Sequence, residues 1–274
     1  MSRSLKYIDF LSLDVVAGAV LMTLSISKIL QVELPISITI CLGISIWTIY
    51  TLDHLLDAFR ANQKPTIARH LFHKENARWI IPVWLLVVLF GAYTALSLPA
   101  VTFLYGIGMV LTVLIYFTLI YFFRTFYFKE VVVAIVYSCG IFVGPMSLLH
   151  GSISTNSLVL LLEVFLLALV NLILFSRFES KFDDHDKHPS IVLALGAVQT
   201  QKLLDGLFLT IGVVQCYFLI SNYNIQSLAY FQGLFIVMAL VLFSMKTCPS
   251  FFTKNDRYRL IGDGIFFIPA LVLL

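Results

Sequence analysis

Long apolar stretches, separated by short polar segments, follow one another along the whole chain. A helix needs about 20 mostly apolar residues to cross the hydrocarbon core of a bilayer. The stretches that approach this length predict nine membrane-spanning helices, at 10–29, 35–56, 80–98, 101–122, 131–149, 158–175, 203–220, 228–243 and 260–274. Two of the polar connections, 57–79 and 176–202, are long, and we expect them to be loops that carry function.

Composition supports a membrane protein. Apolar residues make up 60% of the 274 residues and charged residues only 12%, whereas a soluble domain carries about 25% charged residues. So few charges cannot cover the surface of a soluble fold of this size, and lipid is the solvent that fits. We therefore predict an all-α fold, a polytopic integral membrane bundle of about nine transmembrane helices that forms a single domain over 1–274.

The basic residues give the expected orientation. With the N-terminus in the cytoplasm and nine alternating spans, 17 of the 18 lysines and arginines fall on the cytoplasmic side, and only Lys28 falls outside. The positive-inside rule predicts this asymmetry. The net charge of +3 is then a consequence of topology, and we expect no nucleic-acid partner. The chain is expected in a plasma (inner) membrane, with its N-terminus and active site cytoplasmic.

Two pairs of acidic residues stand at the ends of predicted spans. Asp53 and Asp57 end the second span, and Glu179 and Asp183 follow the sixth. Residues four apart share one face of a helix, where like charges repel. Both spans run from outside to inside, so both pairs are expected at the same membrane surface. Acidic residues at membrane depth are expensive and usually functional.

The residue types of these pairs suit a divalent cation. Mg²⁺ takes carboxylate, water and phosphate oxygens, and it commonly binds one or two carboxylates together with substrate phosphates. Asp53, Asp57, Glu179 and Asp183 are therefore the predicted metal ligands and catalytic residues. Nearby basic side chains would bind the remaining phosphate oxygens. The candidates for that role are Lys64, Arg69, Arg124, Lys129 and Lys181. We also expect Tyr50 and Asp186 to line the cavity that these acidic and basic residues would form.

This arrangement resembles the UbiA superfamily of intramembrane prenyltransferases. Members have nine helices, an Asn-Asp-x-x-Asp-x-x-x-Asp motif ending the second helix and an Asp-x-x-x-Asp motif ending the sixth. Asp53 and Asp57 match the last two aspartates of the first motif, and Glu179 and Asp183 match the second. The resemblance implies that Mg²⁺ binds a polyprenyl diphosphate, whose prenyl group passes to a lipophilic acceptor such as an aromatic ring. The isoprenoid tail would lie in the apolar bundle, open to membrane lipid.

The chain departs from the family pattern in the first motif. Ile49 and Tyr50 occupy the Asn-Asp positions, and no clear match to the family's Tyr-x-x-x-Lys element follows the fourth span. The departures predict a metal site with fewer polar ligands. Two non-enzymatic alternatives therefore stay open: a transporter, or a family member that has lost catalysis and binds lipid. Transport sites tend to lie near the bilayer midplane, whereas both acidic pairs here are expected at one surface.

Overall fold

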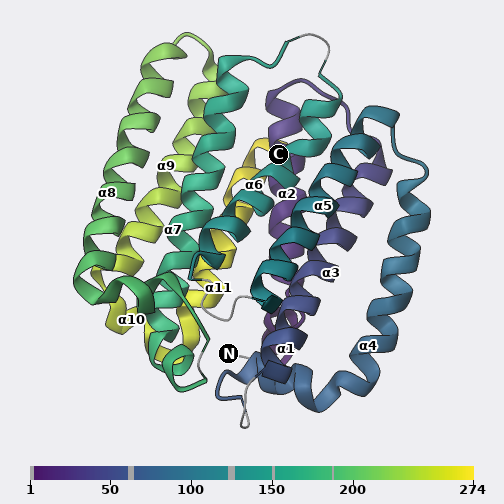
Figure 1. Ribbon diagram of the computed structural model, residues 1–274. Helices are drawn as coiled ribbons and strands as arrows, with labels where there is room; N and C mark the ends of the chain where they lie inside the picture. Colours follow the sequence, from purple (N-terminus) through teal and green to yellow (C-terminus); the bar gives the residue numbers. More distant parts are fainter. Residues whose placement is uncertain (1–2, 61–64, 123–126, 150–151, 187) are drawn as a thin grey trace.

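The computed structural model describes residues 3–60, 65–122, 127–149, 152–186 and 188–274, and this part of the chain is helical, without strands (Figure 1). The α-helices are α1 (Arg3–Phe10), α2 (Leu13–Ile29), α3 (Ile36–Arg60), α4 (Ala68–Ala95), α5 (Ala100–Phe122), α6 (Lys129–Ser147), α7 (Thr155–Asp186), α8 (Ile191–Ser221), α9 (Gln226–Thr247), α10 (Pro249–Thr253) and α11 (Arg257–Gly264). Two 3₁₀ segments complete the fold, η1 (Lys254–Asp256) and η2 (Ile265–Leu273).

Within the described residues, seven helices, α3 to α9, are long and apolar enough to cross a membrane. The all-α prediction is confirmed, and the seven helices identify an integral membrane protein. The first and last of the nine predicted spans are not among them. The first is α2, which has only 17 residues. The last divides into α11 and the 3₁₀ segment η2, which contains Pro269.

The two long loops expected from hydropathy are largely helical, and that prediction was wrong. α3 continues to Arg60 and α4 begins at Ala68, while α7 continues to Asp186 and α8 begins at Ile191. The helices extend beyond their apolar stretches because polar residues continue a helix readily once it has formed. Within α8, Gly196 has a φ of 74°, a conformation that glycine adopts without steric cost, so the helix is interrupted there.

α7 is the central helix of the bundle (Figure 1), and most of its residues from Leu160 to Phe175 are buried. By contrast, α4 and α5 lie at the periphery and expose large apolar side chains such as Leu86, Leu89 and Ile115. Large exposed apolar surfaces are rare on monomeric soluble proteins. These outer faces therefore suit contact with lipid.

The C-terminal segment packs closely into the bundle. η2 lies along α2 (Figure 1), and a Cβ on Gly18 would come within 3.1 Å of the Phe266 Cβ. α11 packs on α7 more tightly still, because a Cβ on Gly262 would lie 2.5 Å from both Asn171 Oδ1 and Phe175 Cε1. Glycine at 262 thus allows α11 to approach α7, and this approach brings the start of α11 to one end of the bundle.

Candidate functional site

The C-terminal ends of α3 and α7 lie at the same end of the bundle, beside the N-terminal segment (Figure 1). A cavity of about 110 Å³ lies between them. Its walls include all four predicted ligands, Asp53, Asp57, Glu179 and Asp183. The structure therefore places the two acidic pairs in one site, although they are more than 120 residues apart in the sequence.

Asp57 is buried and faces three basic or imidazole groups. Its Oδ2 atom lies 4.0 Å from Lys129 Nζ and 3.9 Å from His70 Nε2, while its Oδ1 atom lies 3.8 Å from His188 Nδ1. Lys129 comes from the first turn of α6 and is one of the predicted phosphate-binding residues. It also lies near Asp53 and Asp183. The Lys129 ammonium group therefore interacts with acidic residues from the ends of both α3 and α7.

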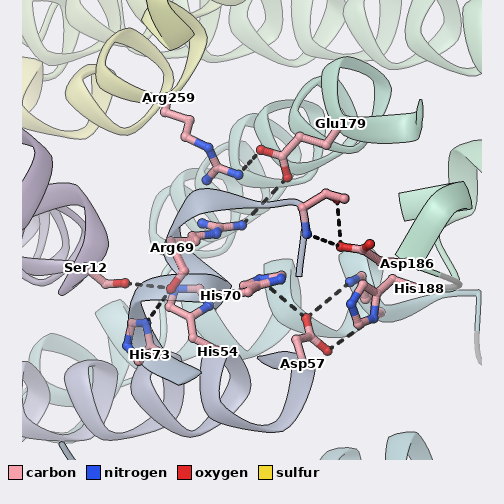
Figure 2. A network of polar contacts seen from close by, with 12 residues as sticks. Ser12, His54, Asp57, Arg69, His70, His73, Glu179, Asp186, His188 and Arg259 are labelled. Atoms are coloured by element: carbon pink, nitrogen blue, oxygen red, sulfur yellow. Dashed lines mark hydrogen bonds and ion pairs between the residues drawn. The ribbon is translucent and has the colours of Figure 1, made fainter. Parts of the chain in front are cut away.

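Glu179 has a different environment. Tyr258 donates its hydroxyl hydrogen to Glu179 Oε1 over 2.8 Å, and Arg259 forms an ion pair with the same carboxylate. Arg69 Nη2 lies 3.8 Å from Glu179 Oε2 (Figure 2). Two arginines and a tyrosine thus contact the carboxylate that we expected to bind metal. In this arrangement Glu179 positions the basic side chains of the site.

The predicted cavity-lining residues divide. Tyr50 lines the cavity. Asp186 instead accepts hydrogen bonds from Thr66, from the backbone N–H over 2.9 Å and from the hydroxyl over 2.8 Å. It therefore connects the segment before α4 to the end of α7 (Figure 2).

The predicted phosphate-binding residues divide as well. Arg69 and Lys129 reach the cavity, whereas Lys181 is exposed to solvent on α7 and does not line it. Lys64 and Arg124 lie outside the described residues. Two of the five basic candidates thus face the acidic pairs.

No protein-family model, curated protein or solved structure matches the chain. The functional argument therefore rests on the chain's own residues and on their geometry.

In the part of the chain that the structure describes, four buried histidines lie around the α3 end of the cavity, and the sequence analysis did not predict them. They are His54, His70, His73 and His188. A signal was available, because His70 and His73 are three apart on α4 and thus share a helix face. The gathering of all four depends on how α3, α4 and the α7–α8 connection pack, which the spacing does not show.

His188 is held in place by its backbone. Its N–H donates to the carbonyl of Asp183 over 2.8 Å, and Ile191 N–H donates to the buried Glu130 carboxylate over 3.2 Å. Burial lowers the pKa of His188 below its ordinary value, although the Asp57 carboxylate opposes the shift. The fold thus favours a neutral imidazole at this position.

A second group of acidic residues lines the same cavity. Carboxylate oxygens of Asp9, Asp14 and Asp263 lie within 4.8 Å of one another. They come from α1, α2 and α11, the segments at the two ends of the chain. The cavity is therefore acidic on two sides. Its basic residues include Arg69 from α4, and Arg259 from α11 pairs with Glu179 in its wall.

Proposed function

We propose that the protein is an intramembrane prenyltransferase that moves a polyprenyl group from a polyprenyl diphosphate to a lipophilic acceptor with the help of Mg²⁺. The observation that carries this proposal is the single cavity into which α3 and α7 bring Asp53, Asp57 and Asp183 beside Arg69 and Lys129. Carboxylates with nearby cations are the groups that a magnesium–diphosphate complex requires.

The carboxylates that line the cavity fit Mg²⁺, a hard cation that prefers oxygen ligands. Asp53, Asp57 and Asp183 would hold the ion, which would neutralise charge on the diphosphate leaving group. Lys129 and Arg69 would bind the remaining phosphate oxygens. Glu179 would hold Arg69 in position, because its other oxygen is already bound by Tyr258 and Arg259.

The cavity also has an apolar side, formed by Val133, Leu172 and Phe175. The first isoprene units of the substrate would lie against this side, which would keep water away from the reacting carbon. The C–O bond to the diphosphate breaks, and the leaving group takes the bonding electrons. The resulting allylic cation would lie near Tyr50 and Tyr116, whose aromatic rings favour positive charge. The acceptor then attacks the cation and loses a proton.

The proposed topology has nine spans. α2 and the segment formed by α11 and η2 add to the seven long helices, and they pack against each other as a pair (Figure 1). The site end faces the cytoplasm of a plasma (inner) membrane, as the distribution of basic residues favours.

A second candidate is a protein that binds an isoprenoid or lipid phosphate without catalysis. The observation in its favour is that Ile49 and Tyr50 provide no carboxylate in the turn before Asp53. It predicts that a prenyl diphosphate binds but is not cleaved.

The decisive assay is pyrophosphate release by the purified protein in detergent, with farnesyl or geranylgeranyl diphosphate and Mg²⁺. We expect release that EDTA stops and that Asp53→Asn and Asp183→Asn abolish. Asp184→Asn is the matched control, because Asp184 is exposed next to Asp183, and it should keep wild-type activity. Binding without release would favour the second candidate. If the protein shows no pyrophosphate release and no thermal shift with Mg²⁺ and diphosphate, both candidates are refuted.

The acceptor can be found independently. Lipid extracts of cells with and without the gene should differ by one prenylated product if the protein is a transferase. Identical extracts, together with an inactive purified protein, would contradict the proposal.

A further inference from the structure

Three aspartates from the two ends of the chain form a group that the proposed magnesium–diphosphate site does not use. Asp9, Asp14 and Asp263, the terminal aspartates, line the cavity, and their carboxylate oxygens lie within 4.8 Å of one another. Like charges this close disfavour each other's ionised form, whereas hydrogen bonds donated to a carboxylate favour it. A ligand that brings hydrogen-bond donors to the terminal aspartates would therefore stabilise them.

The protein itself supplies little positive charge to this group. In the ranges that the structure describes, no ion pair joins a terminal aspartate to a basic side chain. Arg259 and Arg69 are the basic residues nearby, but Arg259 already pairs with Glu179 and Arg69 is assigned to the diphosphate. One oxygen of Asp14 accepts a hydrogen bond from the Val15 N–H over 3.0 Å. This side of the cavity thus carries an excess of negative charge.

Tyrosine hydroxyls without a partner gather at the same cavity. Tyr50 and Tyr116 line it, and Tyr137 lies near Tyr50 and Asp263. Tyr116 is 4% exposed and Tyr137 is 8% exposed, yet within the described part of the chain none of the three hydroxyls makes a hydrogen bond. A buried tyrosine hydroxyl usually has a partner. These hydroxyls, which are independent of the carboxylates, indicate a ligand with hydrogen-bonding groups.

Tyr50 lies between the two acidic sides of the cavity. It is near Asp14 and Asp263 on one side and near Asp53 on the other. A ligand beside Tyr50 would reach the terminal aspartates with its polar groups and remain next to the prenyl carbon, because the diphosphate is assigned to Asp53. Val15, also in the cavity wall, offers an apolar contact for a ring. A prenyl acceptor requires such a position, since reacting atoms must approach to about 3–3.5 Å.

We propose that the terminal aspartates, with the hydroxyls of Tyr50 and Tyr137, form the acceptor site, and that the acceptor is an uncharged aromatic ring carrying hydroxyl groups. The carboxylates accept hydrogen bonds from those hydroxyls, and the tyrosines donate to their oxygens. An acceptor with a carboxylate of its own is disfavoured, because it would enter beside three like charges. The inference rests on the proposed function, since it names the class of the second substrate.

The test compares two probes that differ by one carboxylate. 1-Naphthol is an uncharged hydroxylated ring at neutral pH, and 1-hydroxy-2-naphthoate is the same ring with a carboxylate added. Each is titrated calorimetrically into the full chain in nanodiscs, and the signal of empty nanodiscs is subtracted. Mg²⁺ and inorganic pyrophosphate are present throughout to occupy Arg69 and Lys129, which would otherwise attract the naphthoate.

We expect 1-naphthol to bind roughly tenfold or more tightly than 1-hydroxy-2-naphthoate. 1-Methoxynaphthalene, which lacks the hydroxyl donor, should also bind roughly tenfold or more weakly than 1-naphthol, because a site built to pair with a hydroxyl rejects the analogue without it. Equal affinities for 1-naphthol and the naphthoate, or no saturable binding of 1-naphthol, would overturn the proposal. The wild-type comparison decides even if a variant fails to fold.

Variants locate the site. Asp263→Asn removes one carboxylate and should bring the affinities of 1-naphthol and the naphthoate closer together. Asp256→Asn is the matched control, because Asp256 is exposed before α11 and does not line the cavity, and it should keep the wild-type preference. An unchanged preference in folded Asp263→Asn would also overturn the proposal.

The probes are titrated without a prenyl diphosphate, so acceptor binding and turnover are separate results. A protein that releases pyrophosphate but binds both naphthalenes equally would remain a transferase and lose this acceptor class. A protein that prefers 1-naphthol but never cleaves a prenyl diphosphate would keep the binding site and refute the transfer reaction.

Discussion

Removing the Glu179 carboxylate should destabilise the fold strongly. Glu179 and Arg259 are both buried, with side chains 8% exposed, and they form an ion pair to which Tyr258 adds a 2.8 Å hydrogen bond. Glu179→Ala leaves the buried Arg259 guanidinium beside Arg69 without its ion-pair partner. An uncompensated buried charge is unfavourable because the protein interior solvates it poorly.

The expected magnitude follows from these contacts. Removing one partner of a buried ion pair costs about 3–5 kcal/mol. The Arg69 contact adds little, because that side chain is 21% exposed and lies 3.8 Å away. Tyr258→Phe should cost about 1.5–3 kcal/mol, since it removes a hydrogen bond to a charged group. The double variant Glu179→Ala/Tyr258→Phe should lose less stability than the sum of the two single losses, because both changes act on one carboxylate.

Reversible unfolding by SDS in mixed micelles, followed by tryptophan fluorescence, measures these differences. Asp184→Ala is the control on the same helix, and it should change stability by less than about 0.5 kcal/mol because Asp184 is exposed. A loss below about 1 kcal/mol for Glu179→Ala would refute the reasoning. It would mean that water reaches the Arg259 guanidinium once the carboxylate is gone.

Three further predictions follow from other contacts. Gly262→Ala should destabilise the fold by about 1–3 kcal/mol, because its Cβ would lie 2.5 Å from atoms of α7; Gly264→Ala, with nothing within 4 Å, should be tolerated in the same unfolding assay, and equal losses would contradict the packing of α11. Thr66→Ala removes the hydroxyl hydrogen bond to Asp186 and keeps that of the backbone N–H, and it should speed amide exchange at the start of α4, whereas Thr66→Ser should not; unchanged exchange in the alanine variant would contradict a role for the hydroxyl. Burial lowers the pKa of His188, so the unfolded chain binds more protons and stability should fall as the pH drops below about 6.5; His188→Gln should reduce this loss in unfolding measured in the metal-free protein, and an unchanged pH dependence would contradict it.

The sequence predicted the parts of the fold that depend on local composition. The apolar stretches located the seven long helices, and the direction of the chain in the second and sixth spans predicted that Asp53 and Asp183 would lie at one surface. Hydropathy could not locate the helix ends, because α3 and α7 continue through polar residues to Arg60 and Asp186. A polar segment has the same low hydropathy whether it forms a loop or continues a helix beyond the membrane.

The contacts within the site depend on packing between distant segments. Glu179 matches the spacing of a metal ligand, but its partners Tyr258 and Arg259 lie about 80 residues away, on α11. Their approach depends on Gly262, whose small size lets α11 contact α7. The burial of His188 beside Asp57 likewise follows from the short α7–α8 connection, where hydropathy suggested a long loop.

The central claim is that the two acidic helix ends bind one diphosphate together with a divalent cation. Calorimetric titration of the purified protein with farnesyl thiodiphosphate, an analogue that is cleaved very slowly, tests it most directly. We expect binding that Mg²⁺ strengthens roughly tenfold or more in the wild-type protein and that Asp183→Asn loses, while Asp184→Asn keeps it. Equal affinity in Mg²⁺ and in EDTA, or unchanged binding by Asp183→Asn, would contradict the claim.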